Sequence, residues 1–143
     1  MLSACGSNAV ASSSASRIEV RSGAIAGLGR VLVDGAGYTL YVYMPDQRGK
    51  SRCSGICAKK WPPLVLPASQ KHAVAGPGVR ATLLGSVPRP GGDRQVTYDG
   101  WPLYTTAETT PGQANGQAST MGAWETISVS GAVDHGIVAR HGS

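Results

Sequence analysis

Two segments of the chain repeat one pattern, and this repetition constrains the fold more than any other feature. Each has a short β-rich run, an Asp-Gly turn and a second run containing Leu-Tyr, over residues 31–43 and 95–106. Asp-Gly between alternating apolar runs is a strong hairpin signal, because a tight turn needs positive φ. Two copies are too few for a solenoid or a propeller. We therefore predict a mainly β fold, with a single small β domain built from two hairpin-containing repeats.

Leu40 aligns with Leu103 and Tyr41 with Tyr104, with two extra residues in the first loop. Side chains alternate along a strand, so the leucines and the tyrosines face opposite sides of their strands. Isolated hairpins are marginal in water. We expect the two repeats to bury Leu40 and Leu103 against each other.

The length and composition fit one such domain. The 143 residues include 20 Gly, 9 Pro and no Phe, which favours short strands and turns, and no segment shows sustained helical periodicity. We expect the β domain over residues 17–131, with repeat units at about 28–66 and 84–129. Residues 67–80 are predicted to form a mobile loop, and residues 132–143 a flexible tail.

The N-terminus carries the pattern of a lipid-attachment site. Residues 2–6 read Leu-Ser-Ala-Cys-Gly, as in a bacterial lipobox, where small residues precede a cysteine that becomes acylated. Only four residues come before Cys5, so the basic and apolar parts of a signal peptide are missing, and a chance match is the alternative. Residues 7–16 are small and uncharged. We predict a lipobox remnant and disordered tether over residues 1–16, acylated at Cys5.

Charge and hydropathy bear on partners. The net charge is +5, and the densest basic group comprises Arg48, Lys50, Arg52, Lys59 and Lys60. No helical or RNA-binding pattern surrounds that group, so we predict no nucleic-acid partner. Anionic headgroups or wall polymers could attract it, or it could be a solvated face. No run reaches the roughly 18–20 apolar residues of a membrane span. We therefore expect the lipid to hold the chain on the extracytoplasmic face of the bacterial cell membrane.

The three cysteines make an odd count. If Cys5 carries lipid, Cys53 and Cys57 remain as a C-x₃-C pair, and an oxidising compartment favours a disulfide between them. Extended residues four apart are separated by about 13 Å, too far for that bond, so the segment must turn, and Gly55 permits it. A redox-active pair and a metal site are the alternatives.

Several strings fall into a larger pattern. Y-x-[FWY]-x-x-D runs from Tyr41 to Asp46, and C-x₃-C-x₃-W-P-P follows from residue 53 to 63. The second half has Y-[DN]-G-x-P-L-Y over residues 98–104 and P-G-x-x-N-G-Q over 111–117. Together they resemble a bacterial lipoprotein family with the Y-x-[FWY]-x-x-D motif, the secreted repeat of unknown function, over roughly residues 28–129.

The resemblance implies a secreted protein without established chemistry. The second copy departs from the family pattern, because Thr106 stands where an aromatic residue is common and no Asp follows at the matching offset.

Five residues are candidates for a polar aromatic binding surface: Tyr41, Tyr43, Asp46, Trp61 and Tyr104. Asp46 could accept a hydrogen bond from a tyrosine hydroxyl there. Alternatively, the tyrosines are strand residues whose rings pack and whose hydroxyls reach water. We identify no catalytic constellation, metal site or cofactor.

Two functions remain open. The first is a non-catalytic binding or interaction module of the cell envelope, whose partner is an envelope component or protein. The second is an extracytoplasmic redox, electron-transfer or metal-handling protein that uses Cys53 and Cys57.

Overall fold

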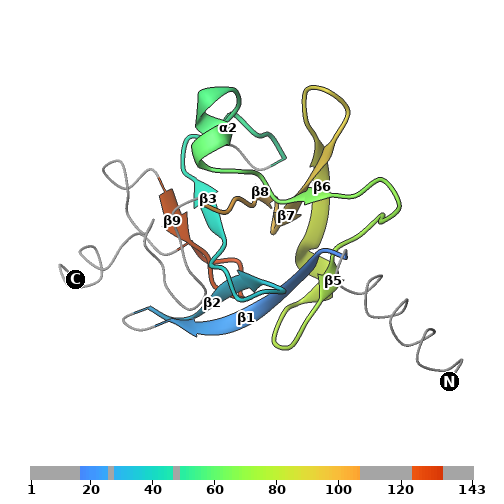
Figure 1. The fold of residues 1–143 in the computed structure, drawn as a ribbon. Coiled ribbons are helices and arrows are strands. Elements are labelled where there is room, and N and C mark those ends of the chain that lie inside the picture. Colours follow the sequence, from blue (N-terminus) through green and yellow to red (C-terminus); the bar gives the residue numbers. More distant parts are fainter. Residues whose placement is uncertain (1–16, 26–27, 47–48, 107–123, 134–143) are drawn as a thin grey trace, which may run out of the picture.

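The computed structural model describes residues 17–25, 28–46, 49–106 and 124–133 (Figure 1). Cys5, the predicted tether, the P-G-x-x-N-G-Q string and nearly all of the predicted tail lie outside the described residues. The predictions made for them stay predictions.

The described chain is mainly strands. The first half contains β1 (Glu19–Ile25), β2 (Gly29–Asp34), β3 (Tyr41–Tyr43), the short helix α2 (Ile56–Lys60) and β4 (Val65–Leu66). The second half contains β6 (Leu84–Pro88), β7 (Arg94–Tyr98), β8 (Trp101–Pro102) and β9 (Trp124–Thr126). Between them lie β5 (Val74–Ala75) and the 3₁₀ turn η1 (Ala81–Leu83). The mainly β prediction is confirmed.

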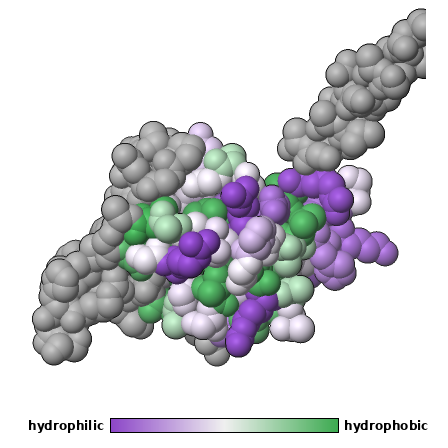
Figure 2. Space-filling model, turned by 90° about the horizontal axis from the view of Figure 1, so that it is seen from below, coloured by the Kyte–Doolittle hydropathy of each residue, from purple (hydrophilic) through white to green (hydrophobic). Residues whose placement is uncertain are grey.

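Three small sheets surround a common interior. Their strand orders are β2-β1-β5, β3-β9 and β4-β7-β6, with β8 paired to β7. In Figure 1 the first sheet crosses the bottom of the molecule, β3 and β9 lie to the left, and β6 and β7 lie to the right. Seen from below, the first sheet presents hydrophilic and hydrophobic residues side by side (Figure 2). Burial alternates only at the start of β1, where Val20 and Ser22 are buried and Arg21 is exposed.

The two predicted hairpins form, but their turns differ. Asp99 and Gly100 have φ of 50° and 83° and make the two-residue turn between β7 and β8, as the Asp-Gly signal predicts. In the first hairpin it is Gly37, with φ of 95°, that takes the left-handed conformation, rather than Gly35. The side chain of Asp34 instead closes that loop, because its Oδ1 accepts two backbone N–H groups at 2.9 Å.

Hydrogen bonds define the equivalence of the two hairpins. The amide of Leu40 donates to Leu32 O at 3.0 Å, and the amide of Leu103 donates to Val96 O at 2.9 Å. The first loop is therefore longer by one residue, and the predicted difference of two is wrong. The error arises because Asp34 ends its strand whereas Asp99 belongs to its turn.

The two halves exchange their last segments. The amide of Leu32 donates to Ile127 O at 2.9 Å, and that of Val96 donates to Leu64 O at 2.8 Å. Ile127 follows β9 at the end of the second repeat, whereas Leu64 precedes β4 at the end of the first. Each hairpin is thus completed by the end of the other repeat.

A reciprocal backbone pair lies where the halves meet. Tyr41 N donates to Tyr104 O at 2.8 Å, and Tyr104 N donates to Tyr41 O at 2.9 Å. On one side of this pair lies the main hydrophobic core, which comprises Val20, Leu32, Leu40, Val42, Leu64, Leu66, Val96, Tyr98, Leu103 and Ile127. Leu40 and Leu103 are fully buried, as predicted, and each contributes about 2–3 kcal/mol.

Two features of the strands differ from expectation. β1 pairs with β2 as β6 pairs with β7, so the first repeat includes a strand before residue 28. Residues 67–80, predicted to be mobile, contain β5, which pairs with β1. The Gln70 amide anchors this segment, because it accepts from Ile18 N at 2.8 Å and donates to Ile18 O at 2.9 Å.

The helix α2 was not predicted, because its five residues are too few to show helical periodicity. Among the residues that the structure describes, no helix has the length and apolar character to cross a membrane.

Candidate functional site

An aromatic cluster fills the space on the other side of the Tyr41–Tyr104 pair. Trp61 and Trp124 stack with ring centroids 3.9 Å apart and planes inclined by 4°. Tyr41 and Trp61 form a T-shaped pair with centroids 5.4 Å apart, and Tyr104 and Trp124 form another with centroids 5.1 Å apart. Trp61 begins the exchanged segment of the first repeat and Trp124 that of the second. The cluster therefore has the same internal symmetry as the backbone.

The two repeats contribute different residues at the edge of the aromatic cluster. Tyr43 stacks on Trp124, with centroids 4.4 Å apart and planes 26° apart. The equivalent position in the second repeat, two residues after Tyr104, is Thr106. The departure from the family pattern at Thr106 therefore leaves the second repeat without a matching aromatic stack.

Cys53 and Cys57 form a disulfide beside the cluster, as predicted. Their Cα atoms are 5.3 Å apart, and Gly55, with φ of 61°, provides the turn at the start of α2. Cys53 is 1% exposed and packs with Trp61, whereas Cys57 is half-buried. A bridged pair offers no thiolate to a metal ion.

A buried polar network lies next to the aromatic cluster and joins the two repeats. The Tyr104 hydroxyl donates to Asp46 Oδ2 at 2.7 Å, and Arg52 N donates to Asp46 Oδ1 at 2.6 Å. Ser51 Oγ lies 2.6 Å from the same hydroxyl. Because Tyr104 gives its proton to Asp46, Ser51 donates to Tyr104. The tyrosine hydroxyl that Asp46 was expected to bind thus comes from the opposite repeat.

Arg89, in the loop between β6 and β7, extends this network. Its Nη1 donates to Ser51 Oγ and to Gln95 Oε1, each at 2.8 Å, and its Nη2 donates to Cys53 O at 3.0 Å. Gln95 Nε2 in turn donates to Leu103 O at 2.7 Å. The second repeat thereby fixes the disulfide loop of the first.

Burial shifts the pKa of two groups in the network. It raises the pKa of Asp46 above its ordinary value. The hydrogen bonds from Tyr104 and Arg52 and the charges of Arg89 and Arg52 lower that pKa, but burial has the larger effect. Burial also raises the pKa of Tyr104 to about 12, so that hydroxyl remains a donor at neutral pH. No buried side-chain nitrogen or oxygen of the described residues lacks a hydrogen-bond partner. The network is a closed structural element.

The structure brings all five candidate surface residues together, but in the interior. Tyr41 and Tyr104 are fully buried, Asp46 is 3% exposed and Trp61 is 7% exposed, while Tyr43 is half-buried. The prediction of a binding surface made by these five side chains is therefore wrong, since they pack against one another rather than facing solvent. The idea that the tyrosine hydroxyls reach water also fails at Tyr104.

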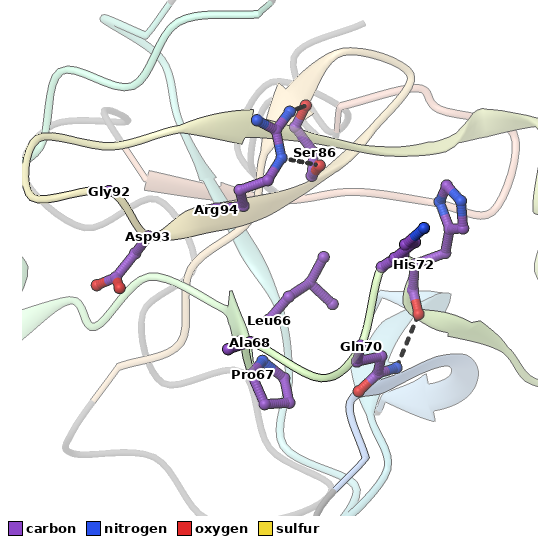
Figure 3. A pocket seen from close by; sticks show the side chains of 10 residues that line it. Leu66, Pro67, Ala68, Gln70, His72, Ser86, Gly92, Asp93 and Arg94 are labelled. Atoms are coloured by element: carbon purple, nitrogen blue, oxygen red, sulfur yellow. Dashed lines mark hydrogen bonds between the residues drawn. The ribbon is translucent and has the colours of Figure 1, made fainter.

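A groove lies elsewhere, between the segment after β4 and the β6–β7 hairpin. Its volume is about 540 Å³. Leu66 lies within the groove, with Arg94 on one side and Gln70 and His72 on the other (Figure 3). The polar lining comprises Gln70, Lys71, His72, Ser86, Asp93 and Arg94.

Arg94 is held in the groove by Ser86. Its Nε donates to Ser86 Oγ at 2.8 Å and its Nη2 donates to Ser86 O at 3.0 Å. Sequence reasoning missed this groove because Lys71 and His72 fall in the segment expected to be mobile. Their sequence carries no motif, and only the pairing of β4 with β7 brings them near Arg94.

Within the described ranges, no three His, Cys, Asp or Glu side chains are grouped so that they could hold a metal ion.

The comparisons with known proteins give one match. The model of a family described as a secreted repeat of unknown function matches residues 24–65 and again residues 85–127. No curated protein and no solved structure matches the chain.

Proposed function

The chain belongs to the family of secreted repeats of unknown function, and we propose that it is a non-catalytic binding module of the bacterial cell envelope. As a secreted repeat it works outside the cytoplasm. In this proposal an acylated Cys5 holds it at the extracytoplasmic face of the membrane, and the folded domain binds an envelope component.

The groove carries the proposal. Its volume of about 540 Å³ lies within the range of about 300–1,000 Å³ typical of small-molecule sites. Lys71 and Arg94 supply positive charge, and the two bonds that Arg94 donates to Ser86 hold its guanidinium in place before any ligand arrives. Asp93 adds a carboxylate, whereas the Gln70 amide is engaged by the backbone of Ile18 and His72 and shapes the wall. This lining suits a ligand that carries an anionic group beside hydroxyl or amide groups.

The closed interior supports a non-catalytic role. Asp46 and Tyr104 are the described groups with raised pKa, and both are committed to hydrogen bonds that hold the repeats together. A reacting substrate would have to displace Arg52 N or Ser51 Oγ from them. We therefore assign these residues to the fold and the groove to binding.

The groove is tested by NMR titration of the full chain with three envelope-type probes of different chemistry. These are a phosphodiester-linked polyol, a short peptide and an uncharged oligosaccharide. We expect shifts at Arg94 with the phosphodiester, and loss of that binding in Arg94→Gln. Arg21→Gln, which removes an exposed arginine from β1, is the matched control and should bind as the wild type does. Shifts that avoid the groove would contradict the proposal.

The lipid anchor has its own test. Intact mass spectrometry of membrane-extracted protein, made from the full gene in its host, should show a diacylglyceryl or triacyl adduct on Cys5. Cys5→Ser should abolish the adduct and release the protein from the membrane. Unmodified Cys5 in the membrane fraction would disprove the anchor while leaving the groove untouched.

Redox activity is the second candidate, and the exposure of Cys57 favours it. A thiolate must reach one sulfur of a disulfide to reduce it, and Cys57 is half-buried whereas Cys53 is enclosed. Equilibration with glutathione buffers decides the matter. We expect a potential below about −300 mV, typical of structural disulfides. A potential near that of oxidoreductases would favour the redox function.

A further inference from the structure

One surface of the molecule remains outside the proposals above, and it lies at α2. Of the residues that the structure describes, Ile56 is the large hydrophobic residue that is strongly exposed, at 85%. It begins α2, directly after Gly55 and beside the disulfide. No residue of α2 is fully buried, and only its Cys57 side packs against the aromatic cluster, so the helix lies on the surface of the domain. In Figure 1 it lies at the end of the molecule opposite β1 and β2.

Four basic residues lie near this apolar side chain along the chain. Lys59 and Lys60 form the last turn of α2, and Lys50 and Arg52 lie in the segment before it, all four exposed. We call Ile56 and these four residues the α2 tip.

The chain around the α2 tip contains no acidic residue that could offset its charge. Eight Lys and Arg residues and no Asp or Glu lie between Asp46 and Asp93. Asp46 itself is 3% exposed and is engaged by Tyr104 and by Arg52 N, so its charge does not face solvent. The exposed charge of the tip is therefore all positive.

The disulfide fixes the shape of the tip. It closes the loop at the base of α2, and Arg89 Nη2 holds the carbonyl of Cys53 at 3.0 Å. Ile56 is therefore presented on a braced turn and does not need to be ordered on contact. Pre-organisation of this kind lowers the entropic cost of binding.

We propose that the α2 tip docks on an anionic lipid surface, with Ile56 entering the headgroup region and the lysines meeting lipid phosphates. Charge alone would suit a soluble polyanion equally well, but such a partner offers nothing apolar for Ile56. A bilayer offers both a negative surface and apolar depth. The docking does not depend on Cys5 or on the groove, and it would turn the tip of an already tethered domain towards the membrane.

Vesicle flotation of the full chain carrying Cys5→Ser tests this proposal, because no acyl chain can then contribute. The protein should float with phosphatidylcholine vesicles containing about 30% phosphatidylglycerol, remain unbound with phosphatidylcholine alone, and dissociate as salt is raised. Lys59→Gln with Lys60→Gln should lower partitioning about thirtyfold, at about fivefold per charge near such a surface. Ile56→Ser should lower it about tenfold.

Arg17→Gln with Arg21→Gln is the charge-matched control, since both arginines are exposed at or near β1. It should reduce partitioning far less than the lysine pair. All these side chains are exposed, so unchanged thermal unfolding will verify that each variant is folded. Equal losses for the two pairs, or no effect of Ile56→Ser, would overturn the proposal. Soluble polyphosphate binding that is unaffected by Ile56→Ser, without flotation, would assign the tip to a polyanion instead.

Discussion

The first repeat carries an aromatic stack at Tyr43 and the Cys53–Cys57 disulfide loop. The second repeat has Thr106 at the position that matches Tyr43, and it contains no cysteine. The shared framework is otherwise equivalent, from the hairpin leucines to the stacked pair Trp61 and Trp124. The comparison shows that the framework uses two matched copies, whereas the disulfide and the additional aromatic stack belong to the first repeat alone. Arg89 of the second repeat then supports the loop that only the first repeat has.

The strongest way to break the comparison is to separate the repeats. Fragments 17–78 and 79–143 should each be unfolded alone, because each hairpin lacks the segment that the other repeat supplies. Mixed together, they should regain β structure by circular dichroism. Cooperative unfolding of either fragment alone would show that the exchanged segments are dispensable.

Truncating the stacked tryptophans tests whether equivalent positions carry equal weight. Trp61→Ala and Trp124→Ala should each lower the free energy of unfolding by about 3–5 kcal/mol. Trp124→Ala should cost about 0.5–1.5 kcal/mol more, because Trp124 also stacks on Tyr43. Urea unfolding measures both. Equal losses would mean that the Tyr43 stack adds nothing, and Tyr43→Thr should then be neutral.

The polar network can be broken at one atom. Tyr104→Phe should cost about 1–3 kcal/mol, because it leaves a buried carboxylate oxygen of Asp46 without its donor. Tyr43→Phe is the matched control, since Tyr43 is half-buried and its ring remains. A smaller loss in Tyr104→Phe than in the control would contradict the role assigned to the hydroxyl.

The pH dependence of stability sharpens the same contrast. The folded pKa of Asp46 is raised above 3.8, so its stabilising contribution is complete below that pH and is lost as the pH rises through the folded pKa. The stability of the wild type relative to Asp46→Asn should therefore fall across that interval, as measured by urea unfolding at several pH values. A rise with pH would mean that the hydrogen bonds and Arg89 outweigh burial.

The two turns provide the smallest test. Gly37→Ala should cost about 1 kcal/mol, because Gly37 has a φ of 95° that alanine adopts poorly. Gly35→Ala in the same loop is the control, since Gly35 is not left-handed and its added Cβ would meet only the flexible side chain of Glu19. Equal costs in thermal unfolding would contradict this description of the turn.

Local sequence patterns predict the hairpins and the disulfide turn well, because Asp-Gly and Cys-x₃-Cys with Gly55 restrict the backbone over a few residues. They do not predict the exchange of the segments at Leu64 and Ile127, because pairing between distant segments leaves no local period. The candidate site shows the same limit. The sequence predicts that Asp46 accepts a hydrogen bond from a tyrosine. Only the fold shows that this tyrosine is Tyr104, whose hydroxyl lies 2.7 Å from Asp46 Oδ2.

The burial of the five candidate residues also could not be read from the sequence. Tyrosine and tryptophan suit both a binding surface and an interior. Arg89, which belongs to no motif, decides the matter together with Ser51 by satisfying the polar groups of the network. The groove around Arg94 depends on the pairing of β4 with β7, and residue type alone gives no sign of that pairing.

The exchange of segments has a consequence for the order in which the chain is made. The hairpin of the first repeat is completed by Ile127, which follows β9 near the end of the described chain. A ribosome adds residues from the N-terminus, so the first repeat must wait for almost the whole domain before it can close. Such long-range pairing slows folding. For a chain that is exported unfolded such a delay is an advantage, because the first repeat stays open until its last strand has been made.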